Sequence, residues 1–113
     1  IEEKVPSDRR IFNYYDKQHD PDGKYIVDCR VNGMSRPLLV FGIPNDDKCR
    51  DTTITCLQYE KFGVPFRTMA IFEDQESINR KVLARFSDVC DKQFSTLATN
   101  KDRINKYLQE VIK

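Results

Sequence analysis

The sequence predicts one α/β domain of the mixed α+β type, with helices packed on a mixed sheet in the order β-β-β-α-β-α-α. Three patterns carry this prediction. Residues 25–31 alternate apolar and polar side chains, as in a half-buried strand. Residues 38–72 have the pattern of strand, helix and strand with short joints, which indicates a βαβ unit with parallel strands. The last third of the chain carries apolar side chains at helical spacing.

Three strands are expected in the first third of the chain. Residues 10–15 are aromatic and β-prone, and a run of turn-forming residues from Asp16 to Gly23 follows them. After the strand over residues 25–31, Asn32 and Gly33 predict a second turn. Residues 37–43 are apolar at almost every position, which predicts a central strand covered on both faces.

A helix should follow the third strand and lead to a fourth strand over residues 67–72. The run from Pro44 to Asp47 ends the third strand and offers N-caps and first-turn acids for a helix, and Gly63 is a plausible residue just past its end. The side chains expected at helical spacing on this helix are Cys49, Thr53, Cys56, Leu57 and Glu60.

Two further helices complete the predicted domain, which spans residues 9–113. Asp74 can cap the first of them, and Thr99 or Asn100 can cap the second. The first has a stripe of Ile78, Val82, Phe86 and Val89, with Leu83, Cys90 and Phe94 beside it, and the second has Ile104, Leu108, Val111 and Ile112. Residues 1–8 are expected to be a linker or the remnant of an excision from a longer parent chain.

Composition argues against several functional classes. The 113 residues have a formal net charge of +1, which does not favour a strongly basic nucleic-acid-binding domain, although a local patch remains open. The four cysteines match no zinc spacing and stand where apolar residues fit, so they are interpreted as free, buried thiols in a reducing compartment, whereas the alternative of two disulfides is also compatible with their even number. No apolar run is long enough for a membrane span, and a cytoplasmic location is expected.

Two groups of polar residues are candidate sites with simpler alternatives. Asp16, His19, Asp20 and Asp22 resemble part of a calcium loop, but Gln18 and Cys29 stand where ligands belong, which favours a hairpin turn. The second group could meet nucleic-acid phosphates or could simply be the solvated face of the second helix. It consists of Lys81, Arg85, Asp88 and Lys92, with Arg80 nearby.

Asp28 is the most informative single residue. It lies in the middle of an expected strand between apolar neighbours, where a carboxylate is unfavourable unless it is solvated, paired or bound to a metal ion. The simplest interpretation places it on the solvent face of a half-covered sheet.

Residues 24–74 resemble the core of the PD-(D/E)xK nuclease superfamily, the restriction-endonuclease-like fold. Asp28 matches the family's strand aspartate, residues 38–43 match its third strand, and Gln58 and Tyr59 match a pair on its helix. The chain is also similar to the C-terminal half of bacterial and phage proteins classed as a domain of unknown function.

The resemblance implies a nuclease-like scaffold whose active site is degenerate. In the family, an acid and a lysine on the third strand hold Mg²⁺ and position water. Phe41, Gly42 and Ile43 stand there in this chain. The residues that would replace them or assist them are Asp46, Asp47, Lys48, Gln58 and Tyr59.

We therefore expect a non-catalytic binding or regulatory module, without a cofactor, within a larger bacterial or phage protein of a mobile-element or defence system. Its partner would be a protein or a nucleic acid, and not a membrane. The alternative is a Mg²⁺-dependent nuclease with active-site residues rearranged around Asp28.

Overall fold

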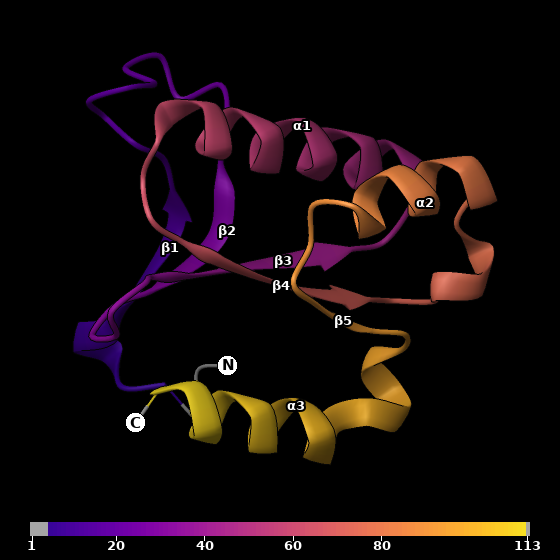
Figure 1. Cartoon of the computed structure of the whole chain (residues 1–113). Helices are drawn as coiled ribbons and strands as arrows, with labels where there is room; N and C mark the ends of the chain where they lie inside the picture. Colours follow the sequence, from indigo (N-terminus) through magenta and orange to yellow (C-terminus); the bar gives the residue numbers. More distant parts are fainter. Residues whose placement is uncertain (1–4, 113) are drawn as a thin grey trace.

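The computed structural model describes residues 5–112 and shows a mixed α+β domain with a five-stranded mixed sheet and three helices (Figure 1). None of the helices in this range is long and apolar enough to cross a membrane. The elements are β1 (Arg10–Tyr14), β2 (Val27–Val31), β3 (Leu38–Ile43), α1 (Asp46–Phe62), β4 (Arg67–Phe72), α2 (Arg80–Ser87), β5 (Lys92–Phe94) and α3 (Leu97–Ile112), with short 3-10 turns at Ser7–Arg9 and Gln75–Ser77.

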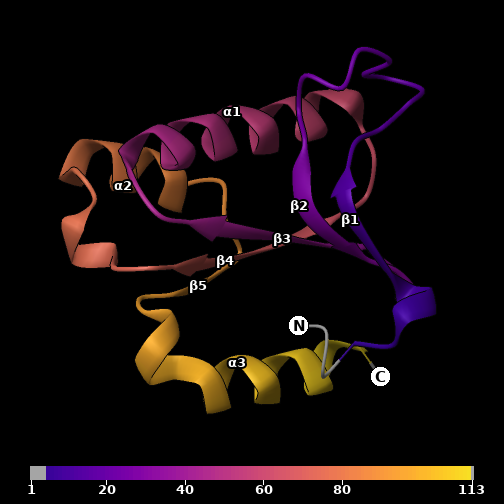
Figure 2. The same cartoon turned by 180° about the vertical axis from the view of Figure 1, so that it is seen from behind.

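The five strands lie in the sheet in their order along the chain, from β1 to β5. β1, β2 and β3 form an antiparallel meander, whereas β4 pairs parallel to β3 and β5 pairs parallel to β4. The expected βαβ unit is confirmed. Helices α1 and α2 lie on one face of the sheet and α3 lies on the other, as the two opposite views show (Figures 1 and 2).

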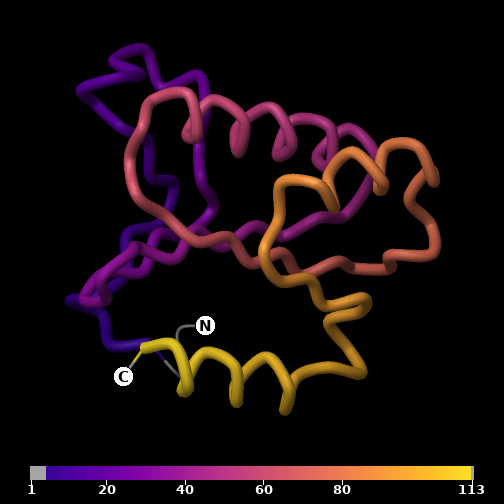
Figure 3. The backbone as a smooth tube through the Cα atoms, viewed as in Figure 1, coloured from indigo at the N-terminus to yellow at the C-terminus, as the bar shows by residue number. Residues whose placement is uncertain are grey.

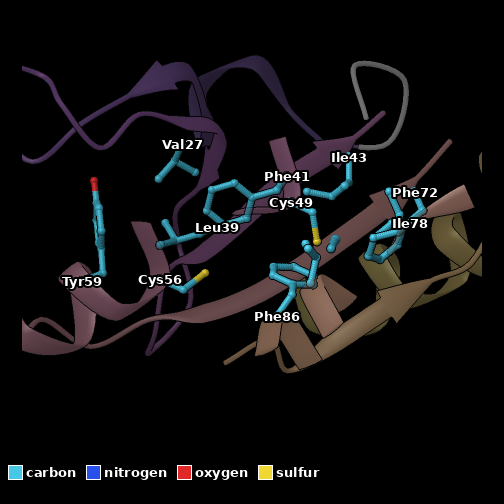
Figure 4. Close-up of a cluster of buried hydrophobic side chains, with 12 residues drawn as sticks. Val27, Leu39, Phe41, Ile43, Cys49, Cys56, Tyr59, Phe72, Ile78 and Phe86 are labelled. Carbon is cyan, nitrogen blue, oxygen red and sulfur yellow. The ribbon is translucent and has the colours of Figure 1, made fainter. Parts of the chain in front are cut away.

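Two apolar clusters, one on each face, make up the core. Leu39, Phe41 and Ile43 of β3 belong to the cluster under α1 and α2 (Figure 4). Leu38 and Val40 belong to the cluster under α3. The prediction that β3 is a central strand covered on both faces is therefore confirmed. The third-helix stripe is also confirmed, because Ile104, Leu108 and Ile112 are buried in the second cluster.

Helix α1 has the predicted ends but a different buried face. The Asn45 side chain accepts a hydrogen bond from the Lys48 N–H, and Gly63 adopts a left-handed conformation with φ of 75°. Its buried residues are Cys49, Thr52, Thr55, Cys56 and Tyr59. Leu57 was expected on this face and is instead exposed, because the buried face follows Cys49, Thr52, Cys56 and Tyr59, and Leu57 lies about 100° around the helix from Cys56.

The second helix is shorter than predicted, and a fifth strand was missed. Asp74 caps only the 3-10 turn, and the Asn79 side chain caps α2 by accepting from the Lys81 and Val82 N–H groups. After α2 the Asp91 carboxylate accepts hydrogen bonds from the N–H and hydroxyl of Thr68. These bonds hold the chain beside β4, so residues 92–94 pair with it as β5 instead of continuing a helix.

The last helix begins earlier than either predicted cap. It starts at Leu97, so both Thr99 and Asn100 lie inside it. The Asn100 side chain is buried. Its amide donates a hydrogen bond to the Thr96 carbonyl at 2.8 Å, so this polar group is satisfied by a residue four positions earlier in the chain. Figure 3 shows that the segment from α2 to α3 crosses the sheet from one face to the other by way of β5.

The four cysteines are free, as predicted. Cys29, Cys49 and Cys56 are buried, and Cys90 is partly buried. Burial raises the pKa of the Cys49 thiol to about 11 and that of Cys56 to about 12, so both stay protonated and unreactive near neutral pH.

The predicted linker over residues 1–8 lies partly outside the described residues, because the structure describes the chain from Val5. Val5 is buried in the cluster under α3, and the 3-10 turn follows it. The Arg10 guanidinium donates to the Val5 carbonyl at 2.6 Å. The domain boundary itself stays a prediction.

Candidate ligand-binding groove at Asp28

The regular sheet is interrupted on both sides of Asp28. The pairing of β2 with β3 begins at Cys29 and Val40, one residue beyond Asp28. The Gly42 N–H instead donates to Asp28 Oδ2 at 2.8 Å, so a side chain takes the place of a strand carbonyl. In β1, Asn13 has a φ of 52°, in the left-handed region that costs most side chains energy and that asparagine tolerates best after glycine.

Asp28 forms an ion pair with Lys48 of α1. The Lys48 ammonium lies 2.9 Å from Oδ1 and 2.7 Å from Oδ2. The side chains are 39% exposed for Asp28 and 32% exposed for Lys48. Asp28 was expected on the solvent face of a half-covered sheet. Its side chain is partly exposed there and is also paired, because it lies between α1 and the open end of the β2–β3 pair.

Beside this ion pair lies a groove with a volume of about 940 Å³. It extends over the ends of β3 and β4 to the first half of α3. The residues that give it its character are Phe12, Asp28, Gly42, Glu73, Leu97 and Lys101. Phe12 and Leu97 are exposed apolar side chains, and its floor includes Val40 and Ile104 of the α3-side cluster. The groove therefore combines apolar walls with two carboxylates and one ammonium.

Five other residues were predicted from the sequence as candidates for this site: Asp46, Asp47, Lys48, Gln58 and Tyr59. Of these, Lys48 alone contacts Asp28. Asp46 accepts a hydrogen bond from the Asn79 N–H at 2.8 Å and thereby ties α1 to the start of α2. Asp47 is exposed and pairs with Arg50 at 3.3 Å. Asp46 and Asp47 therefore make structural contacts of α1 with other partners than Asp28.

The helix pair that the resemblance points to does not line the groove. Tyr59 is buried among aromatic rings, and its hydroxyl donates to the Tyr25 carbonyl at 3.4 Å. Burial raises its pKa, so it stays a neutral core residue. Gln58 is partly exposed next to it.

The loop that resembles a calcium site is a turn, as the simpler interpretation predicted. Asp16 accepts from the N–H groups of Gln18 and His19, and its second oxygen lies 3.0 Å from His19 Nδ1. Burial raises the Asp16 pKa, but these hydrogen bonds outweigh it and the pKa is lowered. The buried Asp20 accepts from the N–H groups of Lys24 and Tyr25. Both carboxylates thus accept hydrogen bonds from backbone N–H groups of the turn.

Between Val5 and Ile112, no three acidic, histidine or cysteine side chains are gathered as metal ligands. His19, the one histidine of the chain, stacks on Phe62 with ring centroids 5.1 Å apart. The geometry around it is that of a packed turn.

The predicted basic row on the second helix is divided between two faces of the sheet. Arg80, Lys81 and Arg85 are exposed on α2. Lys92 was assigned to the same row, which is wrong, because α2 ends at Ser87 and Lys92 lies in β5. Its ammonium lies over the ring of Tyr107 in α3, on the opposite face.

Sequence reasoning missed Glu73 and Lys101. It also missed the gap in the β2–β3 pairing at Gly42. Glu73 directly follows the parallel strand β4, and the carboxyl ends of parallel strands are where ligand sites tend to form, so its position was a usable signal. Lys101 and Leu97 enter the groove through the packing of α3, which no local pattern indicates.

Comparison with protein-family models, with curated proteins and with solved structures finds no match for this chain.

We expect Asp28→Ala to lower the free energy of unfolding by about 0.5–1.5 kcal/mol, because it removes the acceptor of the Gly42 N–H and the partner of Lys48. Lys48→Met should lower the free energy of unfolding by under about 1 kcal/mol. The reason is that water screens the half-exposed ion pair and that Asp28 still accepts the hydrogen bond from the Gly42 N–H. Urea unfolding of both variants measures the difference. A larger loss for Lys48→Met would show that the ion pair outweighs the backbone contact.

Proposed function

We propose that this domain is a non-catalytic binding module, part of a larger bacterial or phage protein, and that its groove binds an extended segment of a partner protein. The observation that supports this most is the open groove of about 940 Å³, whose walls expose Phe12 and Leu97. Its volume falls in the range of ligand-binding clefts, roughly 300–1,000 Å³. Exposed apolar side chains around a cleft are typical of interaction sites.

The charges of the groove favour a protein segment over a nucleic acid. Asp28 and Glu73 place two carboxylates on its lining, and the ammonium groups of Lys101 and of Lys48, which pairs with Asp28, balance them. Phosphates would find no excess of positive charge here, whereas apolar side chains of a peptide would fill the space between Phe12 and Leu97. β1 is also the edge strand of the sheet, and edge strands can pair with an extended segment.

The positions that would carry nuclease chemistry have other roles. Phe41 and Ile43 are fully buried in the cluster under α1, and Gly42 between them has no side chain. Both oxygens of Asp28 already accept hydrogen bonds. The proposal is therefore a scaffold similar to the PD-(D/E)xK core that uses the region of Asp28 for binding.

A metal-dependent nuclease with rearranged residues is the second candidate, and one observation favours it. Lys48 lies within hydrogen-bonding distance of Asp28, and Glu73 lines the same groove. An acid–lysine pair and a second acid therefore share one region. For catalysis, Asp28 would have to exchange the Lys48 ammonium for Mg²⁺, and one or two carboxylates with substrate phosphates commonly hold that ion.

Peptide selection with a blocked groove tests the proposed function. A Cβ added at Gly42 would meet no atom within 4 Å, and its φ is not positive, so Gly42→Leu should fold normally and fill the groove. Phage-displayed random peptides would be selected on the wild-type chain, and binding of the enriched peptides would then be measured by fluorescence anisotropy.

The proposal expects enriched peptides with apolar residues, whose affinity falls at least about tenfold in Gly42→Leu and in Leu97→Arg, since filling or charging a contact site removes about 1.4 kcal/mol or more. Leu57→Arg is the matched control, because Leu57 on α1 is 48% exposed and Leu97 is 49% exposed. It should bind as the wild type does. Failure to enrich any peptide, or equal binding by all variants, would contradict the proposal.

A further inference from the structure

A second and smaller cleft lies where β5 meets α3. Its volume is about 270 Å³. Its lining is Lys92, Phe94, Arg103, Lys106, Tyr107 and Glu110. Arg103, Lys106, Tyr107 and Glu110 lie three or four residues apart on α3, so they share one face of that helix.

Two aromatic rings hold the Lys92 ammonium in this cleft. Phe94 and Tyr107 pack edge to face with centroids 5.9 Å apart. The ammonium lies 5.4 Å from the centroid of Phe94 and 5.6 Å from that of Tyr107. Cation–π contacts fix the position of a lysine but leave its charge unneutralised. Lys92 thus presents a positioned positive charge.

The cleft carries an excess of positive charge in a nearly neutral chain. Lys92, Arg103 and Lys106 line it together with one carboxylate, Glu110. In residues 5–112, none of these three cations lies within 4.0 Å of a carboxylate oxygen. Within the same range, Arg103 donates to the Asn100 side chain alone, at 3.4 Å.

Neighbouring charges leave this excess unchanged. Burial raises the pKa of the Tyr107 hydroxyl, the positive charge of Arg67 opposes that rise, and the negative charge of Asp91 adds to it. The Asp91 carboxylate accepts hydrogen bonds from the N–H and hydroxyl of Thr68 and is held against β4.

We propose that the β5–α3 cleft binds single-stranded nucleic acid, with the phosphates against Lys92, Arg103 and Lys106 and a base against the partly exposed ring of Tyr107. Cations that follow a backbone beside an aromatic ring are the combination by which proteins hold single strands. No residue lines both this cleft and the groove at Asp28, and the groove has no excess of positive charge.

Helix α2 supplies a matched control. Arg80 and Lys81 are exposed there, on the opposite face of the sheet. Neither lines the groove or the β5–α3 cleft, and neither lies over an aromatic ring of residues 5–112. The double variant Arg80→Glu/Lys81→Glu changes the net charge by the same amount as Arg103→Glu/Lys106→Glu. Comparing the two separates a local site from a general charge effect.

The experiment measures fluorescence anisotropy of labelled oligothymidylate and oligouridylate with the wild-type chain over a series of salt concentrations. Binding should weaken as salt rises, and Arg103→Glu/Lys106→Glu should reduce affinity at least about tenfold at low salt and flatten the salt dependence. The α2 double variant should lose less than about threefold, because distant charges are screened. Tyr107→Leu should lower the affinity and leave the salt slope unchanged.

Several outcomes would overturn the proposal. These are no binding at low salt, an equal loss in both double variants, and equal affinity for a labelled duplex of the same length. Binding of the oligonucleotides that disappears in Gly42→Leu would place the nucleic-acid site in the groove and would also overturn it. Circular dichroism of each variant confirms that the fold is retained, and thermal midpoints within error of the wild type are expected.

Discussion

Replacing Leu108 by alanine should lower the free energy of unfolding by about 2–5 kcal/mol, the usual range for a fully buried leucine. Leu108 has no exposed surface and lies in the cluster under α3 with Met69 and Phe94. Its removal leaves a cavity between the helix and the sheet. Urea unfolding followed by circular dichroism measures the loss.

Leu97→Ala is the control on the same helix. Leu97 is half-exposed in the first turn of α3, so its truncation should change stability by under about 0.5 kcal/mol. Equal effects of the two substitutions would show that α3 does not pack on the sheet through the stripe of Ile104, Leu108 and Ile112.

Phe86→Ala should destabilise the domain by about 3–5 kcal/mol. Phe86 is fully buried on α2, and its ring packs edge to face on Phe72 with centroids 5.8 Å apart. Helix α2 spans eight residues, and a helix this short is stable only through its packing. Loss of this ring should therefore loosen α2 as well as open a cavity.

Phe12→Ala provides the comparison for Phe86, because Phe12 is an exposed phenylalanine on the wall of the groove. It should change the thermal midpoint little, whereas Phe86→Ala should lower it by several degrees, about 4–8 °C for each kcal/mol lost in a domain of this size. A small shift for Phe86→Ala would mean that α2 contributes little to the core.

Much of the fold followed from local pattern. The alternation in β2, the apolar run of β3 and the caps Asn45 and Gly63 each agree with the structure, because they depend on neighbouring residues. β5 did not follow from pattern. Its position depends on the bond of Asp91 to Thr68, two residues 23 positions apart in the sequence, and no local window contains both.

The site was predictable to a smaller extent. Asp28 stood out as a carboxylate between apolar strand residues, and its partner Lys48 was among the candidates on the next helix. The groove was not foreseen, because it forms where α3 crosses the ends of β3 and β4. The error over Lys92 has the same origin, since placing it on a helix hid its contact with Tyr107.

The central claim is that Asp28 is held by Lys48 and Gly42 in a groove that binds without cutting, and a cleavage assay tests it most directly. Wild-type protein, Asp28→Ala and Lys48→Met would each be incubated with plasmid, single-stranded DNA and RNA in the presence of Mg²⁺ or Mn²⁺. The predicted result is no metal-dependent cleavage by any of the three proteins, because residues 41–43 place buried Phe41 and Ile43 where an acid and a lysine would be needed. Metal-dependent cleavage by the wild type that disappears in Asp28→Ala would contradict the claim and establish the rearranged nuclease instead.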